Sequence, residues 1–414
     1  MADETTAVVG ESAIEAVELG EDFFREPHAV YERLRRRGPV HFVRFPDAST
    51  GWLVTGYEAA KAAFTDPGIS KVLGAPDALD AVAASGGDHT IRSGLFKDMM
   101  VFYDPPEHTR LRALVNRAFG SRAIRDLEPR VVEIADALLA DMATRADETQ
   151  DLLQEYASPL SMLVICELLG VPPTDRGRFR EWSAIVVSSE PTRDARTTAV
   201  QEFVGYIDAL IRAKMAAPQE DLLSELIAAG EGGNRLSHRE LISMVFLLLV
   251  AGYETSANLI GNAVALLLSG NGSRASLRED PDRIPAFVEE VLRYESPTRE
   301  TTFRYTREPV RLGGVEIPAG QVVVLSVAAA GRDPERFTEP DEFDPDRPAN
   351  QHLAFGHGIH RCVGAQLSRT EGIVALTRLL ATHPDLQLAP DADLTWRKSL
   401  IVRGLTTVPV RLHP

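Results

Sequence analysis

A continuous apolar helical pattern from residue 237 to residue 269 constrains the fold more than any other feature of the sequence. Ser237 and Glu240 have the spacing of a capping box, which predicts that a helix begins there. At 1.5 Å per residue the helix would be roughly 50 Å long, and its most apolar stretch, residues 244–251, should be buried on all sides. Because a helix of this length has to cross the core of a globular domain, we predict a mainly helical protein built around it.

The centre of this predicted helix carries three residue types that are unfavourable in a helix interior. Residues 251–256 read Ala-Gly-Tyr-Glu-Thr-Ser. Glycine costs about 1 kcal/mol there, glutamate is rarely buried without a partner, and threonine can bond back to the carbonyl four residues earlier. Several such conflicts together are typical of a functional site. The alternative is a kinked helix with a solvated Glu254 and a back-bonded Thr255.

The rest of the sequence predicts one large, mainly α domain with minor β sheets. Its 44% hydrophobic and 25% charged residues are an ordinary globular composition. Alternating and turn-bounded patterns predict short strands, and apolar residues at helical spacing predict further helices. The strands are expected at 41–44, 52–55, 310–312, 315–317 and 322–327, and the helices at 131–142, 152–169 and 365–380. The first 21 residues are acidic and lack Lys and Arg, so we expect a flexible tail before a single domain of residues 22–414.

Charge and cysteine content exclude several classes of function. The formal net charge of −16 disfavours binding to nucleic acid or anionic lipid. Two cysteines far apart in sequence, Cys166 and Cys362, argue against a disulfide framework and fit a reducing cytoplasm. The N-terminal residues do not have the basic start and apolar run of a signal peptide. The apolar stretch 244–251 is too short to span a bilayer, so we expect a cytoplasmic protein with no membrane partner.

A glycine-rich loop before the last predicted helix places Cys362 at a helix N-terminus. Residues 355–364 read Phe-Gly-His-Gly-Ile-His-Arg-Cys-Val-Gly. Free backbone N–H groups and the helix dipole favour a thiolate at that position. Such a thiolate could be a nucleophile with His360 as base, a zinc ligand with His357 and His360, or an axial ligand of haem iron. Haem accounts best for the glycines, but the loop alone leaves all three open.

Three motifs together resemble the cytochrome P-450 superfamily. Phe355, Gly358, Cys362 and Gly364 match its haem-binding pattern FxxGxxxCxG. Residues 251–256 match its oxygen-activating pattern [AG]Gx[DE]T[ST], and residues 290–293 match its ExxR motif. The resemblance extends from about residue 22 to residue 412. It is to the soluble bacterial type, similar to actinomycete enzymes that tailor macrolides and other polyketides.

The resemblance implies a cytochrome P-450 fold with haem b between the long central helix and the helix after the cysteine loop. Cys362 would be the axial thiolate and the metal ligand, and Thr255 and Glu254 would be the catalytic pair that delivers protons. Glu290 and Arg293 would be structural, with Arg347 as their third partner in preference to Arg336. The residues expected to bind the cofactor are Cys362, His108, Arg112, Arg304, His360, Phe355, Gly358, Gly364, Ala251 and Gly252.

The resemblance also implies a monooxygenase that inserts one oxygen atom from O2 into a hydrophobic secondary metabolite by hydroxylation or epoxidation. Electrons would come from NAD(P)H through an external ferredoxin reductase and ferredoxin, and the protein would be a monomer. Alternatives are a non-insertive oxidase or peroxygenase of the same fold and a non-catalytic haem sensor. A basic patch of Arg110, Arg117, Arg122 and Arg361 would attract an acidic ferredoxin. The residues expected to contact substrate are Met100, Val101, Phe102, Leu247, Val250, Glu300, Thr301 and Ile401.

Overall fold

The computed structural model describes residues 6–9, 12–72, 98–187, 193–229, 235–269, 273–348 and 350–412, and helices dominate it. The α-helices of the described residues are α1 (Asp22–Arg25), α2 (Pro27–Arg35), α3 (Tyr57–Ala63), α6 (Glu107–Ala118), α7 (Ser121–Ala143), α8 (Ser158–Leu168), α9 (Arg176–Val187), α10 (Arg193–Ala216), α11 (Leu222–Ala228), α12 (His238–Leu268), α13 (Ser273–Glu279), α14 (Ile284–Tyr294), α15 (Val327–Gly331) and α16 (Ala365–Thr382).

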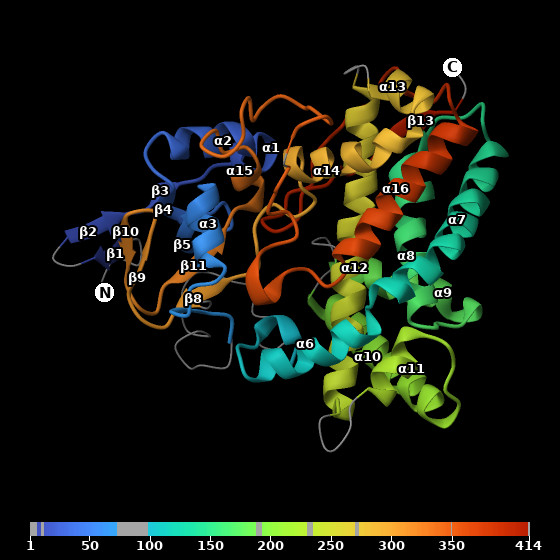
Figure 1. The fold of residues 1–414 in the computed structure, drawn as a ribbon, viewed down its shortest axis with the longest axis horizontal. Coiled ribbons are helices and arrows are strands. Elements are labelled where there is room, and N and C mark those ends of the chain that lie inside the picture. The colour runs from blue at the N-terminus through green and yellow to red at the C-terminus, as the bar shows by residue number, and fades with distance from the viewer. Residues whose placement is uncertain are drawn as a thin grey trace.

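The predicted central helix is confirmed as α12. The Ser237 side chain accepts a hydrogen bond from the backbone N–H of Glu240, and the Glu240 carboxylate accepts one from the backbone N–H of Ser237, so the capping box is complete. The helix packs against α8, α10, α14 and α16, as Figure 1 shows. It is long and apolar enough to cross a bilayer by length and composition alone, but 61% of its most apolar window is buried inside the protein, as in a core helix.

A six-stranded sheet lies beside the helical part of the molecule, next to α2, α3 and α15 (Figure 1). Its strand order is β3-β4-β5-β11-β8-β6, and smaller sheets join β1 with β2, β9 with β10, and β12 with β13 and β7. The strands are β1 (Thr6–Val9), β2 (Ser12–Glu15), β3 (Val17–Glu18), β4 (Val40–Arg44), β5 (Thr50–Val54), β6 (Ile69–Ser70), β7 (Gln150–Asp151), β8 (Arg304–Thr306), β9 (Val310–Leu312), β10 (Val315–Ile317), β11 (Val322–Leu325), β12 (Gln387–Leu388) and β13 (Pro409–Arg411).

The strands predicted at 41–44 and 52–55, and at 310–312 and 315–317, form two hairpins. β4 and β5 pair antiparallel, and so do β9 and β10. Gly313 and Gly314, between β9 and β10, have φ values of +53° and +85°. Two successive positive φ values are what a tight hairpin turn requires, and glycine adopts them without strain.

The N-terminal segment differs from the prediction of a flexible tail up to residue 21. Val17 and Glu18 form β3, which pairs parallel with β4 and so extends the main sheet at its edge. Ala16 and Leu19 on either side of β3 are buried. The backbone groups on the outer edge of β4 need partners, and this short apolar segment supplies them. Ordered structure that belongs to the main domain therefore begins before residue 22.

A buried ion pair ties α14 to the chain that leads into the cysteine loop. Arg293 donates to both carboxylate oxygens of Glu290, at 2.8 and 2.6 Å, and to the carbonyls of Gly331, Pro340 and Glu342. Because the guanidinium is fully hydrogen-bonded, its burial is compensated.

The third member of this network is the predicted one. Arg347 lies with its Nε 3.3 Å from a Glu290 oxygen, whereas Arg336 binds the side chain of Gln351. The preference for Arg347 over Arg336 is confirmed.

Candidate functional site

The cysteine loop folds as its glycines predicted. Gly356 and Gly358 have φ values of +70° and +69°, in the left-handed region. A Cβ on Gly358 would lie only 3.1 Å from the carbonyl oxygen of Phe64, so a larger residue would meet both strain and a close contact. The backbone N–H of Cys362 donates to the carbonyl of Phe355 at 2.8 Å and closes the loop. Arg369 stacks on the Phe355 ring, with its guanidinium carbon 4.5 Å from the ring centroid.

Cys362 is accessible to water, yet the surrounding protein raises the pKa of its thiol by desolvation. The backbone N–H of Gly364 and the Arg112 and Arg361 guanidinium groups counteract the rise in pKa and favour the thiolate. Gly364 places no Cβ between the thiol and the helix N-terminus; the position that a Cβ would take is 4.0 Å from the Cys362 Sγ.

The other cysteine has no such environment. Cys166 is fully buried within α8, and burial raises its pKa to about 12. A buried thiol with a raised pKa is unreactive and cannot reach a ligand. Cys362 is therefore the one of the two cysteines that could bind a metal or cofactor.

One face of α12 is partly exposed, although the helix crosses the core. Leu247, Val250, Ala251, Glu254 and Thr255 are each at least partly exposed, although the neighbouring Phe246 and Leu249 are buried. Successive members of this set are three positions and one position apart in turn, which places all five on a single side of the helix. We call this side the open stripe. The prediction that residues 244–251 are buried on all sides is therefore wrong for residues 247, 250 and 251.

Gly252 does not lie on the open stripe. The position that its Cβ would occupy is 3.5 Å from Ile165 of α8, so this residue faces the helix packing. Gly252 is nevertheless partly exposed, and its contact with the cofactor stays a prediction, whereas Ala251 is the most exposed residue of the stripe.

Glu254 and Thr255 lie side by side on the open stripe and have different partners. Arg397 donates to a Glu254 carboxylate oxygen at 3.0 Å. Burial raises the pKa of Glu254, and Arg397 opposes that rise. The Thr255 hydroxyl donates to the Ala251 carbonyl at 2.7 Å, so Thr255 makes the back-bond considered above, and its oxygen lone pairs remain able to accept a proton. Arg397 was not identified from the sequence because it lies 143 positions away from its partner.

Basic side chains from three separate segments gather near Cys362. His108 and Arg304 are buried, Arg112 and His360 are partly buried, and the His108 and His360 ring centroids are 4.1 Å apart. Burial and the neighbouring positive charges lower the pKa of His360 to about 2. Burial lowers the pKa of Arg304 to about 10, and the charge of Asp104 opposes that fall. His108 Nδ1 and His360 Nε2 are buried with no hydrogen-bond partner among the described residues. Such a cluster requires an anion for stability.

The predicted substrate segments come together only in part. Met100 and Phe102 are buried in the helical turn before α6, Val101 is partly buried there, and Leu247 and Val250 lie on the open stripe. The carbonyl of Ile401 accepts from the backbone N–H of Arg299 at 2.7 Å, so the segments around residues 300 and 401 adjoin. The Thr301 hydroxyl already accepts from Arg304 at 2.9 Å.

Glu300 does not offer a free carboxylate to a substrate. It is 1% exposed and accepts hydrogen bonds from Tyr31, from Arg299 at 2.6 Å and from Ser326 at 3.3 Å. Donors from distant parts of the chain surround this carboxylate, which the local sequence could not show. The expectation that Glu300 contacts substrate is therefore corrected: its contacts are those of a buried structural network.

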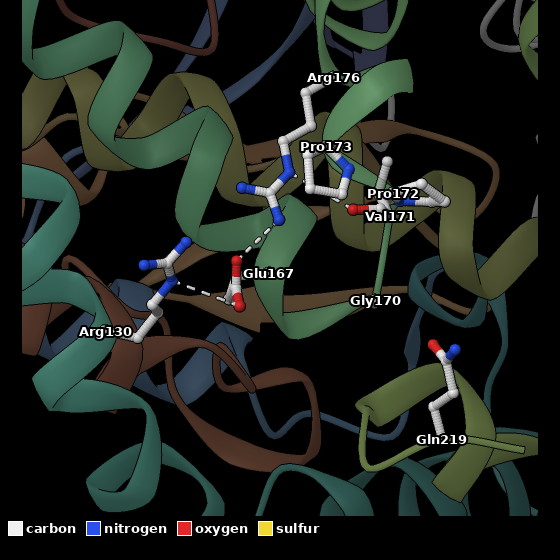
Figure 2. Close-up of a pocket in the computed structure, with 8 residues that line it drawn as sticks. All are labelled: Arg130, Glu167, Gly170, Val171, Pro172, Pro173, Arg176 and Gln219. Carbon is white, nitrogen blue, oxygen red and sulfur yellow. Dashed lines mark hydrogen bonds and ion pairs between the residues drawn. The ribbon is translucent and has the colours of Figure 1, made fainter.

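A pocket of about 390 Å³ lies elsewhere, on the outer side of α8. Figure 2 shows Arg130 and Arg176 on either side of Glu167, with Gly170 to Pro173 and Gln219 completing the lining. Glu167 pairs with both arginines, at 3.4 and 2.7 Å. The pocket contains none of the predicted site residues, and its arginines are already neutralised.

Haem would satisfy the thiol and the basic cluster together. Cys362 would supply a thiolate ligand to its iron, and the buried basic side chains would bind its two propionates. A zinc site is not supported, because the described residues contain no group of three His, Cys, Asp or Glu side chains placed to hold a metal. Fold and site therefore define a haem-thiolate protein.

Comparison with known proteins identifies the family within that class. The family model "Cytochrome P450" matches residues 185–393. The chain is 45% identical over 95% of its length to the vitamin D(3) 25-hydroxylase of Pseudonocardia autotrophica, of which it covers 95%. It is 39% identical over 92% of its length to the mycinamicin IV hydroxylase/epoxidase of Micromonospora griseorubida, of which it covers 94%. The structure of PksS, the bacillaene polyketide synthase cytochrome P450 of Bacillus subtilis, superposes with a TM-score of 0.86 at 36% identity, with 95% and 99% of the two chains covered.

The chain belongs to the cytochrome P450 family. It is an oxidoreductase of the monooxygenase type that uses haem with a cysteine thiolate ligand. Like bacterial members of this kind, it receives electrons from external redox proteins and acts on small hydrophobic molecules.

Proposed function

We propose that this cytochrome P450 hydroxylates or epoxidises a polyketide or macrolide that is bulky, apolar and uncharged near the reacting carbon. The printed names of two relatives support this class, since one is a hydroxylase and epoxidase of mycinamicin IV and the other belongs to a polyketide synthase. A third relative acts on vitamin D(3), so a secosteroid is the class to be tested against it.

The observation that carries the proposal is the open stripe of α12. Its N-terminal part consists of the apolar residues Leu247, Val250 and Ala251. The polar side chains of Glu300 and Thr301, which were expected to contact substrate, are already hydrogen-bonded to Arg299 and Arg304. A lining of this kind recognises a substrate by shape and apolar contact. Met100 adds a side chain that can adapt to a bulky ligand.

We assign the chemical roles as follows. Cys362 binds the haem iron, and His108, Arg112, Arg304 and His360 bind the propionates. When bound, haem with this thiolate supplies the activation of dioxygen.

The chain's own residues control the protons that this activation consumes. Burial raises the pKa of Glu254 and so favours a proton on its carboxyl group, against the opposing charge of Arg397. Arg397, one-third exposed, connects that carboxyl group with solvent. Thr255 can accept a hydrogen bond at Oγ1. To relay a proton, its hydroxyl must release its own hydrogen as it accepts another, which requires its bond to the Ala251 carbonyl to break.

The ligand assignment is tested with the two cysteines. Cys362→Ser should abolish the red-shifted ferrous–CO Soret band that is typical of thiolate ligation, while Cys166→Ser should retain it. Retention of the band in Cys362→Ser would refute the assignment.

The substrate class is tested by titrating the wild-type protein with a macrolide, a linear polyketide, vitamin D(3) and a long-chain fatty acid. The change in the Soret band reports binding near the iron, and mass spectrometry of turnover mixtures reports a gain of one oxygen atom. We expect the tightest binding and the oxygenated product with the macrolide or the polyketide. Tightest binding and turnover of vitamin D(3) would reject the proposed class and leave the monooxygenase activity intact.

We further propose that the external electron donor is an acidic ferredoxin, served by a ferredoxin reductase that uses NAD(P)H, and that the protein is a cytoplasmic monomer. Arg117 and Arg361 are exposed and support such docking. Arg110, expected to join them, is instead paired with Glu107 and Glu240, and the side chain of Arg122 lies outside the described residues.

A further inference from the structure

A lysine that the sequence did not single out is buried beside the basic cluster. Lys71 follows β6 directly and is 3% exposed. Its ammonium group donates to the Thr302 hydroxyl and lies 6.0 Å from the centroid of the Phe102 ring. Within the described residues no salt bridge pairs Lys71 with a carboxylate. A buried ammonium group without a counter-ion is strongly destabilising.

The nearest acid does not neutralise this lysine. Asp104 accepts from the Ser70 hydroxyl at 2.5 Å and from the backbone N–H of Lys71 at 3.2 Å. Its carboxylate also pairs with Arg307 at 3.0 Å. Asp104 therefore fixes the backbone at Lys71 and is occupied by another cation, while the ammonium group points to the hydroxyl of Thr302.

A second positive charge lies near Lys71. β6 and β8 pair antiparallel with Ile69 opposite Thr306 and Ser70 opposite Tyr305, and Lys71 and Arg304 are the next residues beyond these pairs in the two chain segments. Besides burial, the charge of Arg304 helps to lower the pKa of Lys71, so the two groups repel each other. Both side chains are buried, and both belong to the positive field that lowers the pKa of His360. An anion between them would convert this repulsion into attraction.

We propose that Lys71 binds a haem propionate, as a fifth basic side chain added to His108, Arg112, Arg304 and His360, and that Thr302 positions its ammonium group. This inference rests on the proposed assignment of haem to the site. It adds a residue that directly follows β6 to anchors that otherwise come from α6, β8 and the cysteine loop. Haem binding then stabilises the β6–β8 edge as well as the helical core.

The test compares Lys71→Met, Lys71→Arg and the control Lys61→Met, which removes a lysine from the partly exposed surface of α3. Haem loss is measured as transfer to excess apomyoglobin, followed by the Soret band. A charged hydrogen bond to a buried carboxylate predicts that Lys71→Met loses haem about tenfold faster or more. Lys71→Arg should stay close to the wild type, and so should Lys61→Met.

A second measurement separates haem binding from a general structural role. After haem is extracted, Lys71→Met should melt at the same temperature as the wild type or higher, since the methionine removes a buried repulsion with Arg304. Equal haem-loss rates in Lys71→Met and the wild type would overturn the proposal. The proposal would also be overturned if Lys71→Met lowered the melting temperature, relative to the wild type, by the same amount in the haem-loaded and the haem-free protein. If the wild type itself lacked the thiolate-type ferrous–CO band, the proposed function would fail first, and the two failures are thus distinguishable.

Discussion

The most distinctive pH response that the structure predicts arises at Glu371. This residue lies on α16, is 2% exposed and has one carboxyl oxygen without a hydrogen-bond partner among the described residues. Burial raises its pKa to about 8, and only Ser161 and Ser256 oppose that rise. The side chain is therefore a neutral carboxylic acid at pH 6. It extends from α16 toward Ser161 of α8 and Ser256 of α12.

The sign of the effect follows from the pKa values of the two states. The unfolded chain has a pKa near 4.5 at this residue, so between pH 4.5 and pH 8 the folded state binds more protons than the unfolded state. The free energy of unfolding then falls as pH rises through this range. From pH 6 to pH 8 the loss is about 2 kcal/mol, and little more is lost at higher pH once both states are ionised. In Glu371→Gln this contribution is absent.

Equilibrium urea denaturation of the haem-loaded protein at pH 6 and pH 8 measures the effect, with the loss of α-helical circular dichroism as the signal. The wild type should lose about 2 kcal/mol more than Glu371→Gln over this interval. Subtracting the two proteins removes the contributions of His28, whose lowered pKa is about 4, and of other groups that titrate in both. If the two proteins showed the same change with pH, Glu371 would not be a buried neutral acid and the reasoning would be refuted.

Three further predictions concern catalysis and electron transfer. Thr255→Ala should bind haem and substrate normally but divert electrons to hydrogen peroxide, and an unchanged ratio of product to NAD(P)H consumed would contradict its role in proton delivery. Arg397→Gln removes the charge that lowers the pKa of Glu254, so any dependence of that ratio on the protonation of Glu254 should move to higher pH; an unchanged pH profile would exclude this coupling. Reduction by an acidic ferredoxin should slow with added salt, because the Debye length is only about 8 Å at physiological ionic strength. Arg117→Glu should slow reduction further at unchanged substrate affinity, whereas the control Arg311→Glu, on the β9–β10 hairpin, should not; a salt-independent rate with no effect of Arg117→Glu would reject the docking surface.

Features set by neighbouring residues could be read from the sequence. The start of α12 depends on Ser237 and Glu240, the β9–β10 turn on two adjacent glycines, and the cysteine loop on glycines within a ten-residue motif. Each of these three features requires a backbone conformation or a cap that few residue types can provide. The presence of those residue types therefore predicts the local structure.

Features set by distant partners could not be read in this way. Glu300 reads as polar and available in sequence, but Tyr31 and Ser326 bind it in the fold. Arg397 and Lys71 have no local pattern, because their environments are created by α12 and by the β6–β8 pairing. Similarly, Arg110 appeared free until the fold brought Glu240 to it. Charged groups in particular depend on what the tertiary structure places around them.

The pairing of β3 with β4 has a practical consequence for protein engineering. A shortened protein that began at residue 22, where the acidic segment ends, would lose Val17 and Glu18 and leave the outer backbone of β4 without its partner. An uncovered strand edge is a template for intermolecular pairing, so such a truncation should yield aggregates during expression. An affinity tag or a fused reductase should therefore be attached before Ala16, so that the edge strand β3 is kept.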